Sequence, residues 1–343
     1  MEKLLGTNSV IEETRHSSLP RKTFMIFLMF FAVFIIGSML SSLLAAIPQT
    51  IYFMNNDEFA GLINSQHISP ENFEEQINSI LENIPEWLKA STLFATAGTI
   101  LTCMFFCKKM DRKRLFTMGI VKKGCVPEYL FGLLLGFAAF GSIYLLSYLL
   151  GGIKSITIND NLSVWTVILF FFGFLVQGFS EEILLRGYLF PNLATNGSVT
   201  FALFGSAFVF TLLHINNFIM SDAPLYIILF AVLNIFLYGV LSGLYFLRRG
   251  SIWGIAAFHS AWNFMQGNIF GLSVSGQPLT HSVFTSALSD RVLFNGSSFG
   301  PEGSMIASLI FIIGIAVLLM LKNKPVNPPL YGTQKGFSGN NFM

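Results

Sequence analysis

Long apolar runs separated by short polar segments dominate the pattern along this chain. A helix needs about 20 apolar residues to cross the hydrocarbon core of a bilayer. Runs that reach or approach this length predict membrane-spanning helices over residues 23–47, 89–107, 128–150, 164–190, 199–216, 225–247, 252–271 and 304–321. We therefore expect an all-α fold, a polytopic membrane helix bundle of about eight transmembrane helices.

The basic residues between these runs predict which side of the membrane each segment faces, because cytoplasmic loops are rich in Lys and Arg. With the N-terminus in the cytoplasm, the inside segments hold 16 Lys and Arg and the outside segments hold three. The inside segments are 1–22, 108–127, 248–251 and 322–343. This asymmetry predicts that both termini are cytoplasmic.

The charged fraction is 11%, whereas soluble domains carry about 25%. Short loops and the lack of organelle signals favour the plasma membrane, as a bacterial inner membrane. The basic segment 108–127 is explained by anionic lipid of the inner leaflet, so the bilayer is an expected partner and nucleic acid is not.

Two outer segments give weaker signals. Ser69-Pro70 is typical of a helix start, and apolar residues then recur at helical spacing up to residue 88. We expect an amphipathic helix over 69–88 that packs on the bundle or on the membrane interface; a role in gating access is left open. Segment 272–303 is rich in Ser and Gly and predicts a flexible or lightly structured loop.

The stretch Ser180–Phe190, SEEILLRGYLF, places charge inside an apolar run. Carboxylates at that depth are costly and indicate a functional site. Glu182 and Arg186 are four residues apart and predict an ion pair on one helix face. Glu181 is turned about 100° away, on the face of Gln177, and is left as the unpaired acid.

Two histidines also lie in predicted spans. His214 ends the run 199–216, and His259 is followed four residues later by Asn263. Counting residues from the connecting turns places Glu181 and His214 at similar depth, where they can face each other, and places His259 closer to the cytoplasm.

These residues are the components of water-mediated acyl transfer. A Glu and a His can deprotonate water, and a His and an Asn can donate hydrogen bonds to the oxyanion. Each has a structural alternative, since polar residues in spans often only join helices. Asn234 and Tyr238, four residues apart, are predicted to serve that purpose.

Three short motifs stand in order in three of these spans: EEILLR (Glu181, Glu182, Arg186), FTLLH (Phe210, His214) and HSAWN (His259, Asn263). With them, residues of about 160–270 resemble the CPBP family of intramembrane proteases. That family includes the type II CAAX prenyl endopeptidases and bacterial members linked to bacteriocin processing and immunity, also called Abi proteins.

The resemblance implies an eight-span bundle with a cavity that opens toward the cytoplasm. Glu181 and His214 would activate water, His259 and Asn263 would stabilise the oxyanion, and Glu182 and Arg186 would orient that site. The family is often classed with metalloproteases. Glu181, His214 and His259 could hold zinc, while a metal-free mechanism fits the same residues equally well.

The resulting hypothesis is an intramembrane endopeptidase that cleaves a membrane-associated or lipidated peptide. A non-enzymatic scaffold or immunity protein, and a transporter with Glu181 as its proton site, are the alternatives. We expect a cytoplasmic N-terminal segment (1–22), a membrane-embedded helical domain (23–324) with its catalytic core at about 160–270, and a disordered tail (325–343).

Overall fold

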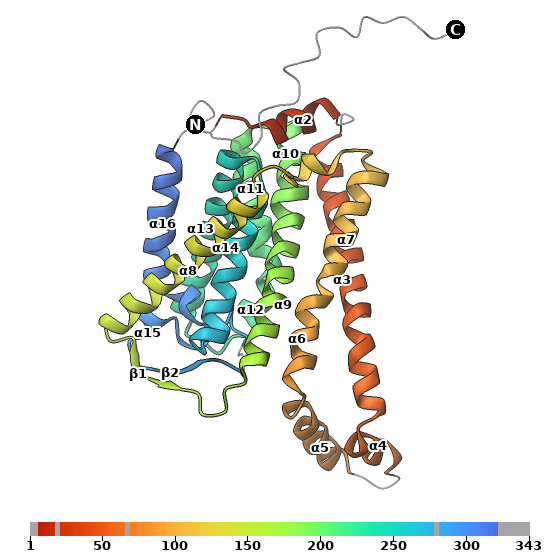
Figure 1. Cartoon of the computed structure of the whole chain (residues 1–343), viewed down its shortest axis with the longest axis vertical. Helices are drawn as coiled ribbons and strands as arrows, with labels where there is room; N and C mark the ends of the chain where they lie inside the picture. The colour runs from red at the N-terminus through yellow and green to blue at the C-terminus, as the bar shows by residue number, and fades with distance from the viewer. Residues whose placement is uncertain (1–5, 18–20, 66–68, 278–280, 322–343) are drawn as a thin grey trace, which may run out of the picture.

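The computed structural model describes residues 6–17, 21–65, 69–277 and 281–321. Long helices run between two ends of a bundle (Figure 1). One end, here called the basic end, holds the N-terminal helix, the segment 108–124 and the Arg248–Arg249 turn; the opposite end, the sheet end, holds a pair of strands. The predicted tail 325–343 lies outside the described residues.

The first half of the chain forms a helical hairpin and then a long helix. Its elements are α2 Ser9–Ser17, α3 Thr23–Met54, α4 Asp57–Asn64, α5 Pro70–Glu82, α6 Glu86–Ala95, α7 Ala97–Phe105, the π-helical turn η1 Phe106–Met110, the 3₁₀ turn η2 Leu115–Met118, α8 Cys125–Leu149 and β1 Ile153–Ile158.

The second half carries the polar residues of the spans. Its elements are α9 Val164–Glu182, the π-helical segment η3 Ile183–Leu189, α10 Phe190–Asn196, α11 Val199–Leu213, α12 Ile215–Ile219, α13 Leu225–Arg249, α14 Trp253–Phe264, the π-helical η4 Met265–Ile269, β2 Phe284–Leu288, α15 Val292–Asn295, η5 Ser297–Phe299, η6 Pro301–Gly303 and α16 Met305–Met320.

Helices occupy each of the predicted spans, and the chain is a mostly helical, multi-pass membrane protein. Five segments among the described residues are long and apolar enough to cross a bilayer: Thr23–Met54, Glu86–Met110, Cys125–Leu149, Val164–Asn196 and Leu225–Arg249. Val199–Leu213 and Met305–Met320 are apolar but shorter. The count of eight spans and the side on which the termini lie stay predictions.

The fold is mostly helical, as predicted, and one pair of short strands was not predicted. β1 and β2 pair antiparallel, with Ile156 opposite Ser286 and Ile158 opposite Phe284. The strand pair and the short helices after it give structure to the described residues of the segment 272–303, which was predicted to be a flexible or lightly structured loop. Each strand is too short to show a clear period of two, and its partner lies more than 100 residues away, so only the tertiary structure reveals the pair.

The outer helix begins as predicted and ends earlier. Ser69 caps α5 by accepting a hydrogen bond from the backbone N–H of Asn72, at 3.3 Å. The helix stops at Glu82, and Pro85 precedes the start of α6. α5 packs against α4, and this pair projects from the sheet end (Figure 1), so the prediction that it packs on the bundle is wrong. Packing on the membrane interface stays a prediction.

The N-terminal segment is tied to the basic end. Val10 and Ile11 of α2 are fully buried, and the Asn8 amide donates hydrogen bonds to the carbonyl oxygens of Phe246 (2.9 Å) and Leu247 (3.2 Å) in the last turns of α13. The Phe246 carbonyl also accepts a hydrogen bond from the backbone N–H of Gly250 at 2.8 Å, so the Asn8 amide adds to the cap at the end of α13.

The basic segment is also anchored at this end. The Lys113 amine is buried and donates to the Asn192 side-chain oxygen of α10, at 2.6 Å. Burial lowers the pKa of Lys113, because the charged form loses its hydration.

Small residues set the position of α14 between α8 and α9. A methyl group on Gly132 of α8 would lie 2.0 Å from the Gly254 carbonyl oxygen, and one on Gly136 would lie 2.5 Å from the Phe258 carbonyl oxygen. From the other side, a methyl group on Gly178 of α9 would lie 2.4 Å from Ser260 Oγ. Backbones can approach this closely only where side chains are absent. Phe258 and Ser260 flank His259, so this packing fixes the height of that histidine.

We expect Gly132→Ala to lower the melting temperature of the purified protein in detergent. Ala gains up to about 1 kcal/mol over Gly in a helix, but overpacking costs about 1–3 kcal/mol. Gly141→Ala on the same helix is the matched control, since nothing lies within 4 Å of its added methyl group. A Gly132→Ala variant as stable as Gly141→Ala would show that the close approach is not required.

Candidate active site

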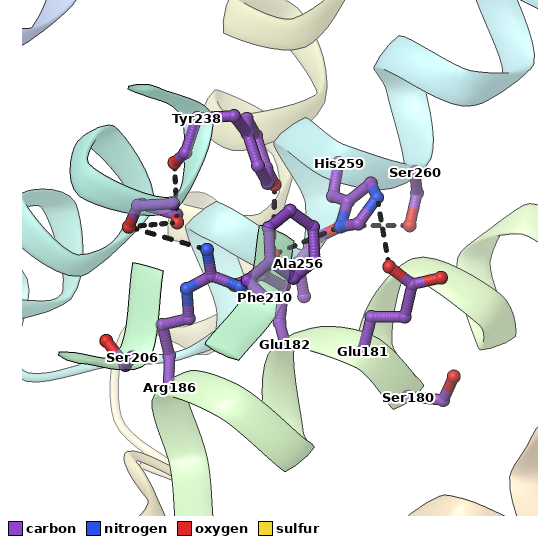
Figure 2. Close-up of polar contacts among 12 residues, drawn as sticks. Ser180, Glu181, Glu182, Arg186, Ser206, Phe210, Tyr238, Ala256, His259 and Ser260 are labelled. Atoms are coloured by element: carbon purple, nitrogen blue, oxygen red, sulfur yellow. Dashed lines mark hydrogen bonds and ion pairs between the residues drawn. The ribbon is translucent and has the colours of Figure 1, made fainter. Parts of the chain in front are cut away.

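Helix α9 delivers the two glutamates at its last turn, and the π-helical segment η3 follows directly. A π-helical turn widens the helix by one residue and is frequent at functional sites. Arg186 lies in this segment, and Figure 2 shows its guanidinium pointing back toward Glu182. The local backbone therefore aims the carboxylate and the cation at the same point inside the bundle.

Glu182 and Arg186 form the predicted ion pair. Arg186 Nη1 lies 3.2 Å from Glu182 Oε1, and both side chains are 0% exposed. The same oxygen accepts a hydrogen bond from the Tyr238 hydroxyl at 3.0 Å and lies 3.0 Å from His259 Nδ1 (Figure 2). One carboxylate oxygen thus joins α9, α13 and α14.

Phe210 explains the aromatic position of the FTLLH motif. The guanidinium carbon of Arg186 lies 4.6 Å from the centre of the Phe210 ring, within range of a cation–π interaction. The Phe210 ring also packs edge-on against the His214 ring, with centroids 4.6 Å apart. Phe210 therefore covers the ion pair on one side and positions His214 on the other.

His259 touches both glutamates. Its Nδ1 faces Glu182, and its Nε2 lies 3.7 Å from Glu181 Oε2. The expectation that His259 lies at a different depth from Glu181 is wrong. That estimate assumed that the connecting turns are level, whereas α10 continues past η3 and the turn before α14 is held against the Gly119 backbone.

Glu181 is the accessible carboxylate, as the helical spacing predicted. Its side chain is 31% exposed, against 0% for Glu182. Gln177 donates a hydrogen bond to Glu181 Oε1, and Asn263 Nδ2 donates to Gln177 Oε1 at 3.1 Å. Gln177 therefore links Asn263 to the acid. The other oxygen, Glu181 Oε2, has no hydrogen-bond partner among the described residues.

His214 closes α11, and its Nδ1 lies 2.9 Å from the Phe210 carbonyl oxygen. No hydrogen bond or ion pair between Glu181 and His214 occurs in the described part of the chain. Instead, the two side chains line one cavity of about 420 Å³ between α3, α7, α9 and α11. Glu181 and His214 were predicted to face each other; they line the same cavity but do not contact each other directly.

A second, small cavity lies on the other side of His214. It has a volume of about 30 Å³, enough for a water molecule, and its polar lining includes His214, His259, Asn263 and Tyr238. His214 and Phe210 line both cavities, so the two cavities meet at these side chains.

The arrangement does not fit a zinc site built from the predicted ligands. Within residues 6–17, 21–65, 69–277 and 281–321, no three His, Cys, Asp or Glu side chains are placed to hold a metal ion. His259 directs one ring nitrogen at Glu182, and Glu181 and His214 lie on the wall of the larger cavity. We derive no step through a metal.

The prediction missed two members of the site. Tyr238 makes the interhelical contact that was predicted, from α13 to Glu182 of α9, but the sequence did not indicate that its partner belongs to the site. Gln177 was predicted to share a helix face with Glu181, but no role was assigned to it. The spacing of four residues between them was the feature of the sequence that could have indicated their hydrogen bond. The prediction that Asn234 joins helices is confirmed, since its amide nitrogen donates to the carbonyls of Glu302 and Ser304 before α16.

Residues 163–265 match the family model described as Type II CAAX prenyl endopeptidase Rce1-like. The matched segment contains all three motifs and every residue of the site described above. This match confirms the resemblance to the CPBP family. No curated protein and no solved structure was found to match the chain.

We expect Arg186→Met to be strongly destabilising, because it leaves Glu182 as an uncompensated buried charge. Breaking a buried pair in this way costs about 3–5 kcal/mol. Arg114→Met is the matched control, since Arg114 is 66% exposed and lies 3.8 Å from Glu13, a contact worth at most about 1 kcal/mol. Thermal unfolding in detergent measures both.

The double variant Glu182→Gln/Arg186→Met removes both charges, and we expect it to recover part of the lost stability. An Arg186→Met variant no less stable than Arg114→Met would contradict the central place of this ion pair.

Proposed function

Because residues 163–265 belong to the Rce1-like family, which is a protease family, we propose that this protein is an intramembrane endopeptidase. It cleaves a membrane-associated or lipidated peptide by attack of a water molecule that Glu181 and His214 activate. The observation that carries the proposal is the pair of cavities that meet at His214. A carboxylate lines one cavity, and a His–Asn pair lines the other.

In the first step, water attacks the scissile carbonyl carbon. The Glu181 carboxylate, which lines the larger cavity, accepts the proton of that water, and His214 holds the water in line. The carbonyl π electrons move to oxygen and form a tetrahedral oxyanion. Hydrogen bonds from His259 and Asn263 stabilise this charge. Because Nδ1 of His259 donates to the Glu182 carboxylate, this assignment requires His259 to be protonated on both ring nitrogens, with Nε2–H facing Glu181 and the substrate.

In the second step, the oxyanion collapses and the C–N bond breaks. Protonated Glu181 returns its proton to the leaving amine, so the carboxylate is regenerated and no other acid is needed. Glu182 does not exchange protons in this scheme. It holds the His259 ring through Nδ1, and Arg186 neutralises its charge. The scheme uses protein groups alone and assigns no role to zinc.

The walls of the larger cavity suit an extended peptide. An unfolded backbone at membrane depth needs partners for its N–H and C=O groups. Hydroxyl side chains of α3 and of the turn into α7 line the cavity beside apolar ones: Ser38, Ser41, Ser42, Thr96 and Thr99. The hydroxyls can satisfy the peptide backbone, and the apolar residues can accept side chains or a lipid group.

We further propose eight membrane passes, with both termini on the cytoplasmic side of the plasma membrane. Successive long helices run in opposite directions between the two ends in Figure 1. Lys and Arg gather at one end, which favours that end as the cytoplasmic one.

Glu181→Gln and His214→Ala should each reduce cleavage of a farnesylated peptide with a CAAX end in proteoliposomes. Loss of a general base lowers the rate by about 10²–10⁴-fold. Glu75→Gln, on the exposed face of α5, is the control that changes a carboxylate away from the site. Full processing by both site variants would rule out the catalytic assignment.

The topology can be tested by single cysteines in a variant without native cysteines. In spheroplasts, a membrane-impermeant maleimide should label Lys154→Cys, an exposed position in β1, and should label Arg114→Cys only after lysis. The opposite pattern would overturn the assigned orientation, and labelling of both sites before lysis would show that the two ends share one side.

A further inference from the structure

A third cavity, mainly apolar and of about 950 Å³, opens between α8 and α16, over α13 and α14. We call it the lateral groove. Its wall consists of apolar side chains from these four helices, among them Phe131, Leu135, Leu241, Ile255, Ile313 and Val317. Volumes of about 300–1,000 Å³ are typical of small-molecule sites. None of the catalytic candidates lines the lateral groove.

The basic end of the lateral groove carries positive charge. Arg248 and Arg249 line its mouth, and Arg249 is 37% exposed. Lys122 and Lys123 are exposed directly before Gly124, which also lines the mouth. Glu128 is the one acid among the lining residues, and it is buried against Arg249 at 3.3 Å. The mouth of the lateral groove therefore has four basic residues and one carboxylate, and its net charge is positive.

Along α16 the length of the lateral groove matches one leaflet of a bilayer, and along α8, where its lining runs from Pro127 to Ser142, it extends to about 22 Å. Along α16 the lining residues run from Ile310 to Leu321, about 16 Å at 1.5 Å per residue. Half of the hydrocarbon core is about 15 Å thick. The lateral groove thus begins at the membrane surface of the basic end, reaches mid-depth along α16 and extends past it along α8.

Its inner end is closed by aromatic rings that also border the active site. Phe258 and Phe311 line the lateral groove, and Phe311 lines the small cavity as well. Tyr238 stacks on Phe258, with ring centroids 6.2 Å apart. A chain in the lateral groove would rest against this wall without entering the cavity of Glu181.

We propose that the lateral groove is a binding site for an anionic phospholipid from the leaflet at the basic end. The acyl chains lie against α8, α13, α14 and α16, and the phosphate faces Arg249, Lys122 and Lys123. Basic pockets between membrane helices on the cytoplasmic side recognise anionic head groups in this way. The site is separate from the catalytic cavities, and the proposal does not depend on protease activity.

Native mass spectrometry of the delipidated full chain tests this site, with phosphatidylglycerol or phosphatidylcholine of the same acyl chains added back. We expect at least ten-fold greater retention of phosphatidylglycerol. Ala138→Trp should abolish that retention by filling the lateral groove. Leu134→Trp is the matched control on α8, since Leu134 is 64% exposed and does not line the lateral groove.

Lys122→Gln/Lys123→Gln should reduce the preference for phosphatidylglycerol over phosphatidylcholine at least three-fold and leave the melting temperature unchanged, because both residues are exposed. Equal retention of the two lipids by the wild type, or unchanged retention by Ala138→Trp, would overturn the proposal. Displacement by glycerol phosphate alone would instead show a simple anion site. Competitive displacement by a farnesylated peptide would assign the lateral groove to the substrate.

Discussion

The buried pair Glu182–Arg186 is the constraint on which the site depends. In a medium of low dielectric, neither charge is tolerated alone, and each needs a fixed partner. The helix supplies that partner four residues away, and Tyr238 and His259 then converge on the same carboxylate oxygen from two other helices. Because three helices meet at one atom, their relative heights are set there.

This arrangement separates two carboxylates that are adjacent in the sequence. Glu182 accepts hydrogen bonds from three side chains and is fully buried, so its carboxylate holds the helices together and does not face the cavity. Glu181 keeps an oxygen that has no hydrogen-bond partner among the described residues, and its side chain reaches a cavity large enough for a peptide segment. A rigid, neutralised pair beside a reactive acid is the kind of preorganisation that supports catalysis.

Close backbone packing keeps α14 in register with this centre. Gly136 and Gly178 admit the backbone on either side of His259, while the lateral groove separates α8 from α16 at the edge of the bundle. The helices therefore pack closely around the catalytic candidates, and a groove separates them at the edge of the bundle. The edge is where a bilayer can supply the missing packing partner.

The sequence alone predicted the helical spans, the ion pair between Glu182 and Arg186, and the division between a paired and an accessible glutamate. These features are local, because a helix brings residues four apart together whatever surrounds it. The contacts of His259 with both glutamates, the role of Tyr238, the packing of α5 on α4 and the β1–β2 pair required the tertiary structure. They depend on the rotation and height of elements joined by turns, and hydrophobic periodicity carries no information on either.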